Sequence, residues 1–108
     1  MSKQLEKEFE GILNRKKNAE QGSYTNYLFN KGKEKILKKV GEEATEVVIA
    51  SMKEDKKELV GEICDLTYHV LVLMAEQNIS IEDIEDELKK RSEKTKNFKG
   101  ERKPVENL

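Results

Sequence analysis

Two pairs of carboxylates carry the clearest chemical signal in this sequence. Glu43 and Glu46 are three residues apart, and so are Glu62 and Asp65. The second pair lies in the segment LVGEICDLTYHVLVLMA, residues 59–75, which is otherwise mostly apolar. An ionised carboxylate in such a helix is strongly unfavourable unless a cation compensates its charge. The spacing and the surroundings together predict a site for a metal ion.

Helical periodicity places the four carboxylates where two helices can share them. At about 100° per residue, Glu62 and Asp65 share a stripe with His69, beside the apolar face of their helix. Glu43 and Glu46 lie at the edge of the apolar face of the preceding helix. If the two helices pack antiparallel, we expect all four carboxylates to face one groove.

The apolar positions that we expect to form the core follow the same periodicity. In the earlier helix they are Ile36, Leu37, Val40, Ala44, Val47, Val48 and Met52. In the later helix they are Leu59, Val60, Ile63, Leu66, Thr67, Val70, Leu73 and Met74. The later helix is apolar beyond this face, so we expect a partner subunit to cover four more residues. These are Cys64, Tyr68, Leu71 and Val72.

Oxygen ligands of this kind favour Mg²⁺. This ion keeps part of its water shell and is usually bound by a few carboxylates together with substrate phosphates. The alternative is that acids three residues apart decorate solvated helix faces, as many do in a chain that is 40% charged. That interpretation suits Glu43 and Glu46 taken alone, whereas the apolar surroundings of Glu62 and Asp65 argue against it.

A run of basic residues comes directly before the first carboxylate pair. It comprises Lys31, Lys33, Lys35, Lys38 and Lys39. One short stretch therefore offers cations for phosphate next to carboxylates for a metal ion. A solvated lysine-rich face is the alternative for each lysine taken singly. Lys39 is the strongest candidate for a phosphate contact, because it lies one turn before Glu43 on the same side of the helix.

The chain is expected to form one small all-α domain over residues 1–108. Of its 108 residues 35% are hydrophobic, and only one proline and six glycines interrupt the chain, which favours helix. We expect a bundle of four to five helices, with a core over residues 2–96 and a polar tail over residues 97–108. So short a chain buries a small core, which favours completion of the fold by dimerisation.

Apolar periodicity divides the chain into helices and one ordered segment. The expected helices span residues 2–19, 32–52, 57–76 and 81–96. Residues 21–32 repeat at no period and are expected to form an ordered loop or a short helix over the groove. Ser80, followed three residues later by Asp83, predicts the N-cap of the last helix.

Charge and cysteine content restrict the partners and the compartment. The net charge is −1 and residues of both signs are interspersed, so we expect neither nucleic acid nor a membrane as partner. The longest apolar run, residues 70–75, is too short to cross a bilayer. The only cysteine, Cys64, is expected to pack as a small core residue in a reducing cytosol.

Two longer motifs resemble a known enzyme family. The first is Ser23-Tyr24-Thr25-x-x-Leu28-Phe29-x-Lys31-Gly32, which continues through Lys35 and Lys39 into Gly41-Glu42-Glu43-x-x-Glu46. The second is Glu62-x-x-Asp65-Leu66-x-Tyr68-His69. They resemble the phosphoribosyl-ATP pyrophosphatases, a family of the MazG-like all-α nucleoside triphosphate pyrophosphohydrolases. The carboxylates alone indicate only this superfamily, whereas the segment over residues 23–32 is more specific.

The resemblance implies a reaction, a cofactor and an assembly. The reaction is hydrolysis of 1-(5-phosphoribosyl)-ATP to 1-(5-phosphoribosyl)-AMP and pyrophosphate, which is the second step of histidine biosynthesis. The cofactor is Mg²⁺. The family also leads us to expect a cytoplasmic enzyme that forms a homodimer or a higher homo-oligomer, with a small nucleotide as its substrate.

The expected site residues divide by task. The expected Mg²⁺ ligands are Glu43, Glu46, Glu62 and Asp65. Together with Glu42 they form the expected catalytic set, although Glu42 has three open roles: it orients the attacking water, holds a lysine or faces solvent. The residues expected to contact the substrate are Lys31, Lys39, Tyr24, Thr25 and Lys35.

Two aromatic side chains near the expected site each allow two interpretations. Tyr24 either closes over the substrate together with Thr25 or fills a gap in the local packing. His69 lies one turn after Asp65, so it either hydrogen-bonds a ligand carboxylate or is a buried histidine whose ring nitrogens are satisfied elsewhere. The sequence alone does not decide between them.

Three other functions stay open on the sequence. A house-cleaning pyrophosphohydrolase of the same superfamily would share the carboxylates but lack the motif at residues 23–32. A ferritin-like di-iron protein would need Glu-x-x-His on two helices, whereas this sequence has one histidine. A non-enzymatic helical interaction module would leave Glu62 and Asp65 unexplained.

Overall fold

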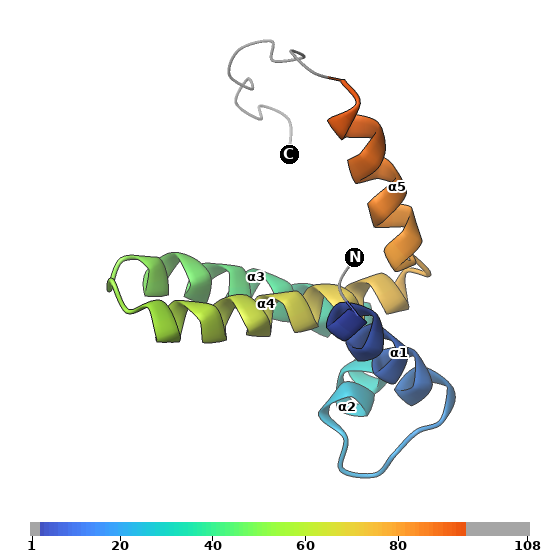
Figure 1. Ribbon diagram of the computed structural model, residues 1–108. Coiled ribbons are helices and arrows are strands. Elements are labelled where there is room, and N and C mark those ends of the chain that lie inside the picture. Colours follow the sequence, from blue (N-terminus) through green and yellow to red (C-terminus); the bar gives the residue numbers. More distant parts are fainter. Residues whose placement is uncertain (1–2, 95–108) are drawn as a thin grey trace, which may run out of the picture.

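The computed structural model describes residues 3–94, and within them all regular secondary structure is α-helical (Figure 1). The five helices are α1 (Lys3–Lys17), α2 (Tyr24–Lys31), α3 (Lys33–Ser51), α4 (Lys56–Glu76) and α5 (Ile81–Ser92). The predicted all-α class and helix number are confirmed. The predicted polar tail, residues 97–108, and residues 2, 95 and 96 of the predicted core lie outside the described residues.

Helices α3 and α4 form a long antiparallel hairpin (Figure 1). The charged residues 53–55 form the turn that joins them, and Glu54 adopts a left-handed backbone conformation there, with φ of 55°. Asp55 caps α4, because its side chain accepts a hydrogen bond of 3.1 Å from the backbone N–H of Glu58. The turn brings the carboxylates of the two helices to the same level of the hairpin.

The segment expected to be a loop or a short helix is the helix α2. Ser23 caps it by accepting a hydrogen bond of 3.2 Å from the backbone N–H of Asn26. Gly32 then joins α2 to α3 with φ of 91° and ψ of −174°, a conformation that is essentially restricted to glycine. This sharp junction turns α2 back across the base of the hairpin.

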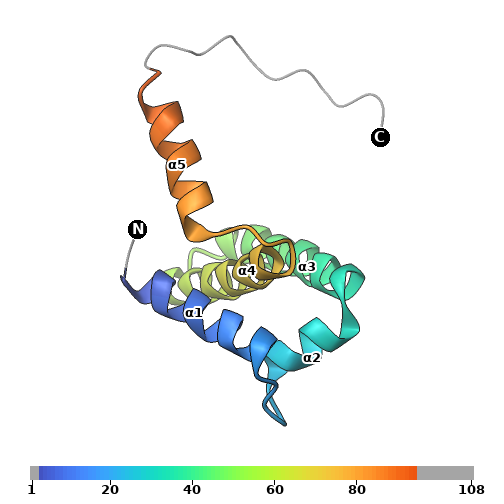
Figure 2. The same cartoon turned by 90° about the vertical axis from the view of Figure 1, so that its right-hand side faces the viewer.

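Helix α5 begins as the sequence predicts. Ser80 and Asp83 form a reciprocal capping box, with hydrogen bonds of 3.0 Å and 2.9 Å between side chains and backbone N–H groups. The helix ends at Ser92, which is earlier than the predicted residue 96. Of its residues only Ile81 is buried, and the rest of α5 extends away from the other helices (Figures 1 and 2).

The hydrophobic core lies between the C-terminal half of α4 and the helices α1, α2 and α3. Its buried members are Phe9, Ile12, Leu28, Ile36, Leu71, Val72, Met74, Ala75 and Ile81. We expected a partner subunit to cover Leu71 and Val72, and this was wrong, because α1 and α2 pack against that face of α4. Tyr68, from the same expected set, is half-buried beside this core.

The far end of the hairpin, residues 46–63, has the opposite character, and we call it the hairpin tip. Here Val48, Met52, Val60 and Ile63 were predicted to be core residues, yet they are 61%, 81%, 51% and 45% exposed. The tip is only two helices thick, so α3 and α4 cover each other on one side alone. The prediction that Cys64 packs as a core residue is also wrong, since Cys64 is exposed at the edge of the tip.

Within residues 3–94, no helix combines the length and the apolar character needed to cross a membrane.

Candidate metal centre

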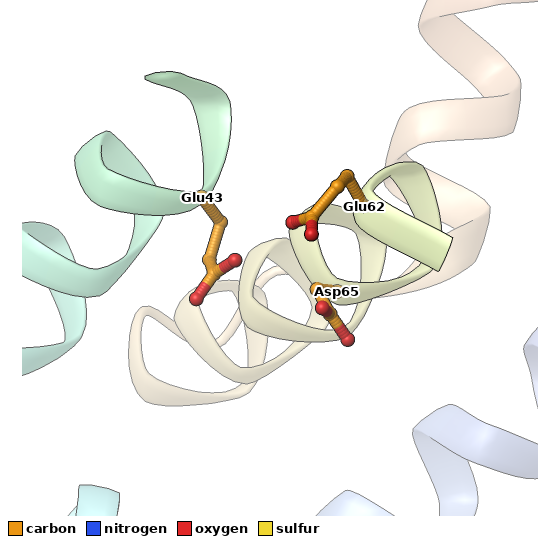
Figure 3. Close-up of side chains that lie close together, drawn as sticks. All are labelled: Glu43, Glu62 and Asp65. Carbon is orange, nitrogen blue, oxygen red and sulfur yellow. The ribbon is translucent and has the colours of Figure 1, made fainter. Parts of the chain in front are cut away.

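Three carboxylates meet across the hairpin where the tip joins the covered base. Glu43 comes from α3, and Glu62 and Asp65 come from successive turns of α4 (Figure 3). One oxygen of each lies within 4.8 Å of the others. The i, i+3 spacing places the two α4 side chains on one stripe, and the antiparallel pairing brings Glu43 opposite them. The groove predicted from the spacing is therefore present for these three residues.

Glu46, the fourth predicted ligand, is exposed and does not belong to this close group. It lies three residues beyond Glu43 along α3, about 4.5 Å further toward the tip. Its negative charge nevertheless acts on Glu62. Its role as a ligand stays a prediction.

The carboxylates repel one another. Burial raises the pKa of Glu62 above its ordinary value, and the neighbouring charges of Asp65, Glu46 and Glu43 raise it further. Glu62 is half-buried, whereas Asp65 is exposed to solvent. The removal from solvent that the sequence predicts for this pair therefore applies in part to Glu62 and not to Asp65. A cation would relieve this repulsion.

Lys39 lies beside the carboxylates on α3, as predicted. Its Nζ is 3.4 Å from Oε1 of Glu43 and 3.5 Å from Oε1 of Glu42, and its side chain is 24% exposed. Burial lowers the pKa of Lys39, but the hydrogen bond to Glu43 and the charges around it outweigh this effect and raise the pKa overall. Glu42 contacts this lysine and is also exposed to solvent, so two of its three expected roles fit the structure, and a role in orienting water stays a prediction.

His69 is 5% exposed and bridges two helices. Its Nδ1 is 2.7 Å from the backbone carbonyl oxygen of Asp65, and its Nε2 is 2.9 Å from the hydroxyl of Tyr24. Because a carbonyl only accepts, Nδ1 carries the proton and Nε2 accepts the Tyr24 hydroxyl proton. Of the two interpretations, the structure supports the buried, satisfied histidine, and this histidine fastens α2 to the metal-site turn of α4.

The start of α2 is held over α4 by aromatic contacts as well. Tyr24 stacks on Tyr68 with ring centroids 6.1 Å apart, and Thr25 Oγ1 hydrogen-bonds the Tyr68 hydroxyl. Burial raises the pKa of Tyr24, and Lys39 partly opposes this. The sequence did not indicate the role of Tyr68. Its position beside His69 in the second motif was the available signal.

The remaining predicted substrate contacts lie further along α2 and α3. Lys31 places its Nζ 5.9 Å from the centroid of the Tyr27 ring, at the end of α2. Lys35 is half-buried near the start of α3, one turn before Lys39. Tyr24 is 44% exposed, and its ring stacks on that of Tyr27. The structure places Lys31 beside Tyr27 and Lys39 beside Glu43.

Comparison with known proteins identifies the family. A family model described as phosphoribosyl-ATP pyrophosphohydrolase matches residues 6–92. Phosphoribosyl-ATP pyrophosphatase of Clostridium acetobutylicum is 59% identical over 104 residues, covering 96% of this chain and 94% of that protein. The enzymes of the same name from Clostridium botulinum and Listeria monocytogenes are 58% and 57% identical over 100 residues, each covering 93% of this chain and 91% and 95% of those proteins. This chain belongs to the phosphoribosyl-ATP pyrophosphohydrolase family.

Proposed function

We propose that this protein hydrolyses 1-(5-phosphoribosyl)-ATP to 1-(5-phosphoribosyl)-AMP and pyrophosphate in histidine biosynthesis, with Mg²⁺ bound by Glu43, Glu62 and Asp65. The observation that carries the proposal is the close approach of these three carboxylates beside Lys39, in a chain of this family. A cytoplasmic location belongs to the same proposal, because a biosynthetic reaction and an unpaired cysteine both suit a reducing compartment.

The donor set fits Mg²⁺. Its ligands are oxygens at about 2.0–2.1 Å from the ion, and small rotations of three carboxylates within 4.8 Å of one another can meet that requirement. Three carboxylates leave positions for water and for phosphate oxygens. When bound, Mg²⁺ would offset the negative charge of the triphosphate and make a coordinated water a better nucleophile.

The side chains around the ion have separate roles in positioning the ion and the phosphates. Glu43, Glu62 and Asp65 fix the position of the ion relative to the hairpin, and the negative charge of Glu46 acts on Glu62. Lys39 has three N–H donors, so it can keep its contact with Glu43 while it donates to a phosphate oxygen. Glu42 holds Lys39 from the other side and limits the directions in which that lysine can point.

We also propose that the protein is a homodimer that pairs through the hairpin tip. The tip exposes Val48, Ile49, Met52, Val60 and Ile63. Two such hairpins packed face to face give a four-helix bundle, which is a common way of burying helices with apolar residues on two sides. Ile63 lies between Glu62 and Asp65 in the sequence, so this interface would border the metal site.

The proposed reaction is tested by incubating the purified protein with phosphoribosyl-ATP and Mg²⁺ and measuring pyrophosphate. We expect turnover that EDTA abolishes and excess Mg²⁺ restores. ATP and dUTP, assayed in parallel at the same concentrations, separate this activity from a house-cleaning pyrophosphohydrolase. A protein that cleaves those nucleotides as efficiently as phosphoribosyl-ATP would support the house-cleaning function, and one that releases no pyrophosphate from any of them would refute both.

A further inference from the structure

A cavity of about 720 Å³ lies next to the start of α2, outside the carboxylate cluster. Gln21, Ser23, Tyr24, Tyr27 and Asn30 are among the residues that line it. This volume lies in the range of small-molecule sites, which typically combine an apolar wall with a few polar groups. The amide side chains of Gln21 and Asn30 provide both donors and acceptors. Of the residues that line it, Tyr24 alone is among the expected substrate contacts.

Two exposed aromatic rings form one wall of the cavity. Tyr24 and Tyr27 are 44% and 41% exposed, and their rings stack with centroids 5.9 Å apart and an angle of 22° between their planes. Exposed aromatic rings beside a phosphate-binding region are suited to a nucleobase, since every base offers a π-face for stacking. The wall is also rigid at one end, because the Tyr24 hydroxyl is held by His69.

The aromatic wall lies between two lysines. On one side Lys39 contacts Glu43 of the metal centre, and its charge acts on Tyr24. On the other side Nζ of Lys31 is 5.9 Å from the centroid of the Tyr27 ring. The order along the surface is therefore carboxylates, Lys39, Tyr24, Tyr27 and Lys31. A ligand that follows it meets a cation, then aromatic rings, then a second cation.

The proposed substrate has the same order of chemical groups. Its triphosphate is attached through a ribose to the five-membered ring of adenine, and its second phosphoribosyl group is attached to N1, on the six-membered ring. Phosphates thus lie on opposite sides of the purine. With the triphosphate at the carboxylates and Lys39, the purine reaches the tyrosines, and the second phosphate points toward Lys31.

Resting on the proposed function, we propose that Tyr27 stacks on the purine of the substrate and that Lys31 binds the phosphate of its N1-linked ribose. Lys31 then distinguishes phosphoribosyl nucleotides from ordinary adenine nucleotides, which lack that phosphate. Tyr27 contributes to the binding of both kinds, because both contain the purine.

The test measures binding without turnover, by calorimetric titration of 1-(5-phosphoribosyl)-AMP and of AMP into the full-length protein in EDTA. The variants are Lys31→Gln, Tyr27→Leu and Tyr27→Phe. Lys33→Gln serves as the matched control, because Lys33 is exposed, carries the same charge and begins the next helix. Far-ultraviolet circular dichroism of each variant verifies that the helices remain folded.

We expect wild type and Lys33→Gln to prefer phosphoribosyl-AMP over AMP. Lys31→Gln should weaken phosphoribosyl-AMP binding about tenfold and change AMP binding less than about twofold. Tyr27→Leu should weaken both ligands about fivefold or more, while Tyr27→Phe, which keeps the ring, should bind like wild type. Equal loss for both ligands in Lys31→Gln, or wild-type affinities in Tyr27→Leu, would overturn the inference. Absence of pyrophosphate release by the wild type would instead contradict the proposed function. The ratio of the two binding affinities would still test the roles of Tyr27 and Lys31.

Discussion

The two ends of the α3–α4 hairpin differ in what this chain supplies to cover them. At the base, α1 and α2 bury Leu71 and Val72, and His69 finds both of its hydrogen-bond partners. At the tip, apolar residues such as Met52 are largely exposed. The three carboxylates lie at the border between the two. The base is therefore complete within one chain. For the exposed tip we propose a second subunit as cover, and for the border a cation and the substrate.

The largest expected effect is on turnover, at the border. Replacing Glu62 by Gln or Asp65 by Asn removes a charge from the metal site, so kcat for phosphoribosyl-ATP should fall by about 10²-fold or more. Asp86→Asn, an exposed carboxylate on α5, is the control and should leave kcat unchanged. Initial rates of pyrophosphate release at saturating substrate measure this. If Glu62→Gln retained wild-type kcat, the border would not be the catalytic centre.

The second expected effect distinguishes base from tip by stability. Leu71 is 6% exposed at the base, and Leu71→Ala should lower the free energy of unfolding by about 2–5 kcal/mol. Met52 is 81% exposed at the tip, so Met52→Ala should change it by less than about 0.5 kcal/mol at dilutions where the protein is monomeric. Urea unfolding followed by circular dichroism gives both values. Equal losses would show that the tip is also packed within one chain.

A third effect concerns association, and it belongs to the tip alone. Val48→Asp places a charge on the exposed apolar surface, so the dissociation constant Kd of the proposed dimer should rise at least about tenfold. Sedimentation velocity over a range of micromolar concentrations should show the wild type as a dimer and the variant largely as the 12.5 kDa monomer. Wild-type protein that sediments as a monomer at every concentration would contradict the proposed dimer through the hairpin tip.

A smaller effect is expected at Lys39, which binds non-reacting phosphate oxygens in this account. Lys39→Ala should raise KM for phosphoribosyl-ATP about tenfold and lower kcat much less, because the contact is present in both the ground state and the transition state. Lys38→Ala, one residue away and exposed, is the control. Should kcat fall with KM unchanged, Lys39 would act in the transition state and its role would need revision.

Much of the fold could be predicted because it depends on local sequence. The capping box of Ser80 and Asp83 and the charged turn after α3 are short-range signals. The meeting of Glu43, Glu62 and Asp65 followed from helical spacing and antiparallel packing. The short segment before α3 was recognised as ordered, although the sequence could not choose between loop and helix.

The predictions were wrong where burial depends on contacts between parts of the chain that are far apart in sequence. Helix α4 is apolar nearly all round, so periodicity could not say whether Leu71 or Val60 faces the core. Helices α1 and α2 pack on one side of α4 and so determine which of its residues are buried. The sequence of α4 alone does not indicate which side they cover. The role of His69 depends on Tyr24, which is 45 residues away in the sequence. Such pairings need the tertiary structure.

The metal-free state provides the most direct test of the central claim, that the border carboxylates bind Mg²⁺. The pKa of Glu62 is raised in the folded protein, so the folded state binds a proton more readily than the unfolded state. The free energy of unfolding therefore falls as pH rises from the unfolded-state pKa of Glu62 through its raised folded-state pKa, and above that range the ionised carboxylate destabilises the fold. Either a bound cation or the change Glu62→Gln removes this destabilisation.

The measurement is thermal unfolding at pH 7 in EDTA and in millimolar Mg²⁺, for wild type and Glu62→Gln. We expect Mg²⁺ to raise the Tm of the wild type and to have a much smaller effect on the variant, whose metal-free Tm should already exceed that of the metal-free wild type. A wild-type Tm that does not respond to Mg²⁺, or one that rises equally in both proteins, would contradict the assignment of Glu43, Glu62 and Asp65 as the metal site.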